Sequence, residues 1–280
     1  MSDIKKFFTS RWGEEGYIVE CDFSQLEIAV LAYLTQDPQL MEDLKEGVDV
    51  HSINAQHLFG KNFTDKQRKI AKSLSFQLQY GAGAASMAES NGIPLKKAKE
   101  FISHYYSRYH EVKAWQDMIA DNVKRNRAPS HKRTAGGLPA GKSVIDSETG
   151  RCYSFHEYDA PSFMRERGVD ASFSPTQMKN YPVQGFATGD IVPMIVGELF
   201  DVLKASPALS KQALLVNTVH DSIVLDVRQE VLDEAIETTL KVMESAPKLL
   251  RKYFGITFNM PLPATASFGR TWGHQVDYVR

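Results

Sequence analysis

The sequence predicts a mixed α/β fold of the α+β type, and three observations lead to it. Residues 17–38 have the pattern of a strand, a tight turn and a helix. A succession of helical patterns then fills residues 38–125. Two β-rich runs, 213–219 and 222–227, have the pattern of an antiparallel hairpin, and a helical pattern follows at 229–253. We therefore expect a small antiparallel sheet backed by helices, and a mostly helical part between its strands.

Composition sets bounds on this expectation. The 280 residues suffice for one large domain or two small ones, and 42% apolar and 24% charged residues are ordinary for a globular protein. Cys21 and Cys152 are the only cysteines, which indicates a reducing compartment. Residues 1–12 lack the apolar core of a signal peptide, and no apolar run is long enough to span a membrane. We expect a cytoplasmic protein.

Charge is distributed unevenly along the chain, although the net charge is only −1. Residues 61–72 carry five positive charges against one Asp, and residues 96–133 carry ten Lys or Arg against four Asp or Glu. Residues 226–244 are acidic. These stretches are either solvated faces or a division between nucleic-acid contact and solvent.

The first strand ends in a carboxylate. Side chains alternate along residues 17–22, so Asp22 lies at the carboxyl end of a core strand, beside a helix start. A carboxylate there is costly unless it is paired, capping a helix or bound to a metal. A helix cap and a metal ligand both remain open at this point, because Asp is a good N-cap.

Two short helices follow. The first begins near Pro38 and ends before Gly47, and the second is capped by Asp49 and ended by Gly60. His51 lies in the first turn of the second helix. A lone His is more often structural than functional, so its role is open.

The helix from Thr64 to Gly81 is the most informative. Thr64 and Gln67 form a capping box, and Gly81 suits the residue just past the helix end. Four side chains at steps of four residues form one gently winding stripe: Arg68, Lys72, Phe76 and Tyr80. Two cations followed by two aromatic rings suit the phosphates, sugar and base of a nucleoside triphosphate. An amphipathic helix with a basic exposed end is the alternative.

The middle of the chain changes character twice. Residues 95–109 and 111–125 predict two further helices, whose aromatic residues suit a core and whose cations can follow a phosphate backbone. Residues 128–173 break this pattern, with strand candidates at 142–145 and 151–156. We expect a β-rich insertion or a mobile loop there.

A helix resumes at Ser174 and must be broken or kinked by Pro182. Gly185 allows another part of the chain to approach the backbone closely. Asn180 and Gln184 carry amides that can contact bases or sugars, or can cap broken helical turns.

The hairpin near the C-terminus presents His220–Asp221 at its tip. An Asp in a turn is usually explained by turn chemistry alone. Together with Asp22 and the cationic–aromatic stripe, however, Asp221 fits two-metal phosphoryl transfer, for which Mg²⁺ and hard oxygen ligands are suited. The chain has no GxxxxGK[ST] phosphate loop.

Three motifs, in order and at fitting separations, resemble those of family A DNA polymerases, the DNA polymerase I family. DFSQLEIAVLAYLTQD is similar to motif A, RKIAKSLSFQLQYG to motif B, and TVHDSIVLDV to motif C. KNYPVQG matches the segment that precedes motif C. The residues of these motifs are most similar to those of phage-type members. The resemblance extends over nearly the whole chain.

This resemblance implies template-directed addition of dNTPs to a primer 3′-OH with two Mg²⁺ ions, which Mn²⁺ can replace. It assigns Asp22, Asp221 and the Phe23 carbonyl to the metals, with Lys72 also catalytic as the donor of a proton to pyrophosphate. The expected dNTP-binding residues are Gln25, Glu27, His51, Arg68, Lys72, Phe76 and Tyr80, with Glu27 excluding a ribose 2′-hydroxyl. The expected primer or template contacts are Asn180, Gln184 and His220.

Some positions depart from the family pattern. Ser222 follows the second aspartate where Glu is common, and Ala29 stands where Arg is frequent. Thr176 occupies a position often given to a primer-binding Arg, and Gln77 and Gln79 replace smaller or apolar residues. We expect these departures to affect primer binding and catalytic efficiency more than the metal site.

The resemblance also implies a domain plan. The palm is expected at 1–44 and 174–280, and the fingers at 45–173 with a β-rich insertion at about 128–173. The family's thumb and any proofreading exonuclease precede motif A, so we expect a separate N-terminal polypeptide carrying a thumb, in a split phage-type replicative polymerase. If the chain is phage-encoded, its location is the bacterial host cytoplasm.

Three other functions fit parts of the sequence: a catalytically silent nucleic-acid-binding subunit, a relative of single-subunit RNA polymerases, and a two-metal nuclease. Both aspartates and the whole stripe argue against the first. Glu27 as a sugar gate favours DNA over RNA, and hydrolysis does not need the stripe.

Overall fold

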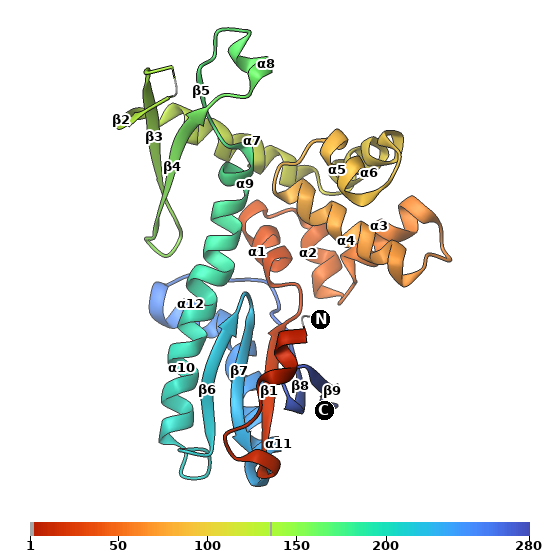
Figure 1. Ribbon diagram of the computed structural model, residues 1–280, viewed down its shortest axis with the longest axis vertical. Helices are drawn as coiled ribbons and strands as arrows, with labels where there is room; N and C mark the ends of the chain where they lie inside the picture. Colours follow the sequence, from red (N-terminus) through yellow and green to blue (C-terminus); the bar gives the residue numbers. More distant parts are fainter. Residues whose placement is uncertain (1–2, 135) are drawn as a thin grey trace. The chain divides into compact units, whose positions relative to one another are not determined.

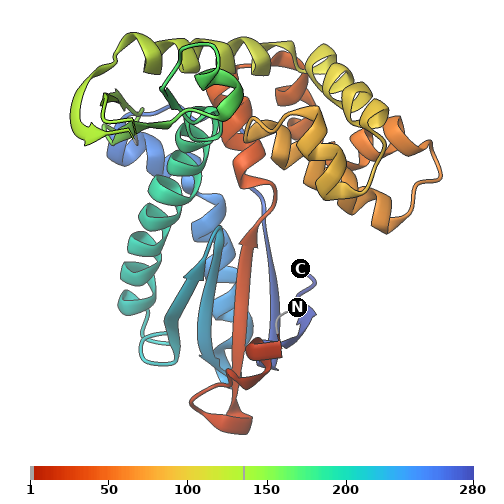
Figure 2. The same cartoon turned by 45° about the horizontal axis from the view of Figure 1, so that its top comes forward.

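The computed structural model describes residues 3–134 and 136–280, and the chain divides into two compact units (Figures 1 and 2). The first unit combines Met1–Val30 with Phe186–Arg280, and the second is Leu31–Gly185. The chain passes between them inside helix α1 (Leu26–Thr35) and again at the start of the π-helical segment η3 (Gly185–Ile191). The predicted mixed α/β class is confirmed.

The first unit is built on an antiparallel sheet in the order β6-β7-β1-β8-β9 (Figure 1). Its strands are β1 (Gly16–Phe23), β6 (Ala213–Val219), β7 (Ser222–Arg228), β8 (Ala264–Thr271) and β9 (His274–Asp277). The alternation predicted for β1 is seen in the burial of Val19 and Cys21, each 0% exposed. The face bearing these residues packs against helix α11 (Leu232–Glu244), which also contacts β7 and β8.

The helices of this unit correct one prediction. Residues 229–253 do not form one long helix: the segment is η4 (Gln229–Val231), α11 and then α12 (Ala246–Phe254). The break falls at Ser245 because Pro247, in the first turn of α12, lacks a backbone N–H and would clash with the preceding helical turn. Helix α10 (Val192–Ala205) packs beside β6, α11 and α12.

The N-terminal segment contacts strand β8 of the sheet. It contains η1 (Asp3–Phe7) and η2 (Gly13–Glu15), and a bridge joins Thr9 to Thr271. The backbone N–H of Trp272 donates to the Phe8 carbonyl at 3.0 Å. These bonds hold the segment next to β8.

The second unit is helical at one end and carries a second sheet at the other, and helix α7 joins them (Figure 2). Its helices are α2 (Pro38–Lys45), α3 (Val50–Phe59), α4 (Asp65–Gln79), α5 (Ala84–Asn91), α6 (Leu95–Arg108), α7 (His110–Arg125), α8 (Ser162–Arg165) and α9 (Pro175–Gln184). The sheet has the order β2-β3-β4-β5, with strands β2 (Ala128–Arg133), β3 (Pro139–Asp146), β4 (Cys152–Asp159) and β5 (Ala171–Phe173).

Helix starts in this unit follow local sequence signals. Asp49 caps α3 through the His51 N–H, Thr64 and Gln67 form the predicted capping box of α4, and Ser174 caps α9. Pro182 lies inside α9, and the seven residues that follow the end of α9 adopt the wider π-helical turns of η3 before α10 begins. The expected disturbance is therefore a change of helical type rather than an end of the helix.

Among residues 3–134 and 136–280, no helix combines the length and apolar character needed to cross a membrane.

Candidate active site

The register of the first sheet brings the two predicted aspartates to one end of it. Asp22, near the end of β1, pairs with Ser222, the first residue of β7. Asp221 immediately precedes Ser222, in the two-residue turn between β6 and β7. Since opposed residues in an antiparallel ladder have Cα atoms about 4.5–5.5 Å apart, the carboxylates occupy neighbouring positions. Asp22 is exposed and Asp221 partly exposed.

Backbone conformation supports this arrangement. His220 has φ +55° and Gln25 has φ +58°, values in the left-handed region that non-glycine residues seldom adopt. His220 thereby closes the tight turn, and Gln25 makes the sharp passage from β1 into α1. The Gln25 side-chain oxygen is buried without a hydrogen-bond partner, and Glu27 lies half-buried in the first turn of α1.

The donor set suits a hard divalent cation. Two carboxylates and a main-chain carbonyl are oxygen ligands of the kind that Mg²⁺ binds, and such sites leave positions for water and substrate phosphates. In the part of the chain that the structure describes, no group of three or more His, Cys, Asp or Glu side chains could hold a metal by itself. Asp22, Asp221 and the Phe23 carbonyl offer oxygen atoms of the type that fits such a cation.

The predicted stripe lies on α4 in the second unit. The Arg68 Nε donates to Asp49 Oδ2 at 2.6 Å, and Nη2 forms an ion pair with the same oxygen at 2.6 Å. Nε also lies 3.2 Å from the Ser52 hydroxyl. Lys72 Nζ lies 5.7 Å from the Phe76 ring centroid. The Phe76 and Tyr80 rings are 6.3 Å apart. The four side chains are thus presented as the helical spacing predicted.

Helix α3 contributes a buried histidine to the same surface. The His51 ring lies 5.6 Å from the Phe76 ring, and the residue is 3% exposed. Burial lowers the pKa of His51 to about 4. The nearby Asp49 charge raises this pKa, and the Lys72 and Arg68 charges lower it. His51 is therefore neutral at pH 7, and its Nδ1 has no hydrogen-bond partner.

The two amides predicted to contact nucleic acid lie one turn apart on α9. Asn180 Nδ2 donates to Gln184 Oε1 at 3.1 Å, and the Asn180 oxygen is buried without a partner. His220, the third residue of this predicted group, is exposed on the first unit.

Two contacts escaped sequence reasoning. The sequence indicated Asp49 only as a helix cap, whereas it also holds Arg68, which follows 19 residues later. Glu20, two residues before Asp22, was not singled out, yet its carboxylate accepts a hydrogen bond from Ser222. The sequence signal that could have identified Glu20 was a charged residue within a predicted core strand.

A family model described as DNA polymerase family A matches residues 1–274. The chain belongs to DNA polymerase family A.

Two curated relatives agree with this family assignment, and a solved structure shares the fold. DNA polymerase I of Lactococcus lactis subsp. lactis is 29% identical over 96% of this chain and 27% of its own length. The thermostable DNA polymerase I of Thermus filiformis is 30% identical over 96% of this chain and 28% of its own. The POL domain of Pol1 from M. smegmatis, solved in complex with DNA primer-template and dNTP, has a TM-score of 0.67 at 22% identity, and the match covers 96% of this chain and 42% of that one. This family A chain thus spans about a quarter of the length of these curated relatives.

Proposed function

We propose that this chain is the catalytic portion of a template-directed DNA polymerase that adds dNTPs to a primer 3′-OH. The observation that carries the proposal is the pairing of Asp22 with Ser222, which puts Asp221 beside Asp22 at one sheet end in a chain of family A. Relatives named DNA polymerase I support the same activity.

Asp22, Asp221 and the Phe23 carbonyl would hold two Mg²⁺ ions, with Mn²⁺ as a substitute. Bound there, the metal would activate the primer 3′-oxygen and offset negative charge that develops on the phosphates. The chain's own part is to hold both carboxylates on rigid strand ends, so that they need not reorganise during the reaction.

The stripe on α4 would bind the incoming dNTP. Arg68 and Lys72 would contact the triphosphate, and Lys72 would give a proton to the leaving pyrophosphate. Neutral His51 can still donate one hydrogen bond to a phosphate oxygen. Phe76 and Tyr80 would pack on sugar and base.

Sugar choice and nucleic-acid contact complete the proposal. Glu27 would exclude a ribose 2′-hydroxyl, and Gln25, whose buried oxygen lacks a partner, would contact the dNTP. Asn180, Gln184 and His220 would contact primer or template. The palm at 1–44 and 174–280 and the fingers at 45–173 remain predictions.

The proposal extends to a polypeptide that carries a thumb, with or without an exonuclease, and to a phage-type split polymerase. The residues found in the three motifs support the phage-type hypothesis. Support for an additional polypeptide comes from apolar side chains near the start of the chain, since Ile4, Phe7 and Phe8 are 62%, 83% and 51% exposed.

The test is primer extension by Asp22→Asn and Asp221→Asn, each assembled with whatever partner the wild type needs. Each change removes one metal-binding charge, so extension should fall below about 1% of wild type while folding persists. Asp201→Asn, on the exposed side of α10, is the matched control and should retain activity. Near wild-type extension by either site variant would refute the assignment.

The same assay separates the other functions. Reactions receive dNTPs, rNTPs or no nucleotide, and both extension and degradation of the primer are followed. Extension with rNTPs indicates an RNA polymerase, degradation without nucleotide a nuclease, and DNA binding without either a silent subunit.

A further inference from the structure

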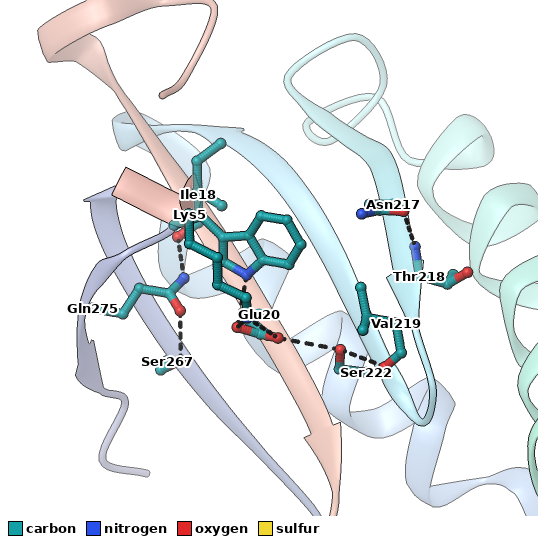
Figure 3. Close-up of polar contacts among 10 residues, drawn as sticks. Lys5, Ile18, Glu20, Asn217, Thr218, Val219, Ser222, Ser267 and Gln275 are labelled. Atoms are coloured by element: carbon teal, nitrogen blue, oxygen red, sulfur yellow. Dashed lines mark hydrogen bonds and ion pairs between the residues drawn. The ribbon is translucent and has the colours of Figure 1, made fainter. Parts of the chain in front are cut away.

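Glu20 is a carboxylate outside the proposed metal-binding pair, Asp22 and Asp221. It connects strand β1 with the first residue of β7. Glu20 lies on β1 two residues before Asp22, and therefore on the same face of the strand. Figure 3 shows its side chain among polar groups from the β6–β7 turn and from the N-terminal segment. The residue is half-buried, which shields these contacts from competing water.

The contact to the turn runs through Ser222. Its hydroxyl lies 3.2 Å from Glu20 Oε1 and 3.0 Å from the Val219 carbonyl (Figure 3). A hydroxyl has one proton and donates to one of these acceptors at a time. Val219 and Ser222 flank His220–Asp221 directly, so this side chain ties the turn to β1.

Glu20 is itself anchored on its other side. The Trp272 indole Nε1–H donates to Oε2 at 2.8 Å, and Lys5 Nζ lies 3.3 Å from Oε1 and 3.4 Å from Oε2. Lys5 also lies 4.2 Å from the Trp272 ring centroid. Both oxygens thus accept donors already, which suits a fixed anchor better than an open metal ligand.

The ladder between β6 and β7 is irregular on the β6 side. The pairing of β6 with β7 shifts register between Leu215 and Asn217, and regular pairing then resumes up to the turn. The Asn217 side chain caps this irregularity by accepting from the Thr218 N–H at 2.9 Å (Figure 3). Since such bulges loosen pairing and redirect side chains, a tether on the β7 side has a mechanical purpose.

We propose that Glu20 is a positioning residue for the metal site, acting through Ser222 to hold Asp221 against Asp22. Ser222 follows Asp221 in the chain and stands opposite Asp22 in the ladder, so it adjoins both aspartates. Groups that hydrogen-bond around metal ligands orient those ligands and tune affinity. This inference rests on the proposed polymerase function.

The test compares Ser222→Ala and Glu20→Gln with wild type. Free Mn²⁺ is measured by electron paramagnetic resonance in titrations of the 280-residue chain, and primer extension is measured against Mg²⁺ concentration. Both variants should bind Mn²⁺ about tenfold more weakly and need about tenfold more Mg²⁺ for half-maximal extension. Ser222→Thr keeps the hydroxyl and should stay within about threefold of wild type.

Ser267→Ala is the matched control. Ser267 lies on the same sheet and donates to Gln275 Oε1 at 3.2 Å, while Gln275 donates to the Ile18 carbonyl at 3.0 Å (Figure 3). It should leave Mn²⁺ binding unchanged. Thermal melting of each variant separates positioning from general destabilisation: a lower melting temperature with unchanged metal dependence would overturn the inference.

Asp22→Asn separates failure of the positioning role from failure of the proposed polymerase function. If it weakens Mn²⁺ binding and Ser222→Ala and Glu20→Gln do not, the positioning role is wrong and the polymerase site stands. If Asp22→Asn changes neither metal binding nor extension, the proposed function itself fails.

Discussion

At the scale of single residues, burial decides the charge that His51 carries. Its ring lies under α4 beside Phe76, where water cannot stabilise an imidazolium. The pKa consequently falls from 6.5 to about 4. If His51 contacts a phosphate at pH 7, as proposed, that contact is a hydrogen bond from a neutral ring.

This burial predicts a pH dependence of stability. The pKa of His51 is lower in the folded than in the unfolded chain. The contribution of the neutral, buried ring to the unfolding free energy is therefore complete above about pH 6.5 and is lost as the pH falls to about 4. The loss should be about 3 kcal/mol of unfolding free energy. In denaturant titrations from pH 7 to pH 4, His51→Gln should lose less stability than wild type by this amount, whereas exposed His131→Gln should follow wild type. Parallel curves for His51→Gln and wild type would contradict the burial argument.

Sugar discrimination is a second residue-scale prediction. If Glu27 packs against the 2′ position, Glu27→Ala should raise ribonucleotide incorporation about tenfold or more. Phe76→Tyr adds a hydroxyl that can replace a missing 3′-hydroxyl, and should raise dideoxynucleotide incorporation. Single-nucleotide insertion kinetics give both ratios, and unchanged ratios in both variants would remove the placement of these two residues at the dNTP.

At the scale of elements, α3 and α4 are joined by polar contacts at both ends of their interface. Asp49 binds Arg68 at one end, and Asn54 donates to the Ser75 hydroxyl at 3.1 Å further along. Burial raises the pKa of Asp49, but hydrogen bonds from Ser52 and Arg68 outweigh it and leave that pKa below its usual range. Asp49 therefore holds the Arg68 side chain in one orientation.

A glycine at the end of α9 yields the element-scale prediction. A Cβ on Gly185 would lie 2.3 Å from a Tyr153 ring carbon of β4, far inside contact distance. Gly185→Ala should therefore cost about 1–3 kcal/mol of unfolding free energy, because the ring or the helix must move.

Gly197→Ala is the control within a neighbouring helix. Nothing lies within 4 Å of its added Cβ in α10, so the change should stabilise the chain by about 0.5–1 kcal/mol. Gly185→Ala combined with Tyr153→Leu should recover part of the loss. Equal effects of both glycine changes in urea denaturation would contradict the close approach.

At the scale of the whole molecule, affinity for DNA depends on how many phosphates the protein contacts. Each contact adds a salt-dependent increment, and this chain has a net charge of −1. Its positive charge is concentrated in residues 61–72 and 96–133 rather than spread over the chain. We therefore expect few phosphate contacts from the 280 residues alone.

The resulting prediction concerns binding and synthesis. The chain alone should bind primer-template weakly, and raising salt from about 50 to 200 mM should reduce affinity further, by tenfold or more. Adding a thumb-bearing polypeptide should give a complex that co-purifies and extends primers at about 0.15 M salt. Fluorescence anisotropy and primer extension, with and without that polypeptide, measure both effects. Processive synthesis by the chain alone would contradict the requirement.

The sequence by itself determined the local features. The capping box of Thr64 and Gln67, the hairpin with His220–Asp221 at its tip and the stripe on α4 depend on residues only a few positions apart. Such patterns have few alternative structures. The break of segment 229–253 at Ser245 also has a local cause, which is Pro247. It was missed because the apolar periodicity continues across the break.

Only the tertiary structure decided how distant segments meet. The pairing of Asp22 with Ser222, the bond from Ser222 to Glu20 and the approach of Tyr153 to Gly185 join residues whose local patterns permit many partners. Strand order and register are selected by burial of whole faces, since a slip of one residue would turn every side chain to the opposite face. The candidate site residues could therefore be named from motifs, whereas their neighbours, such as Glu20 beside Ser222, emerged only from the folded sheet.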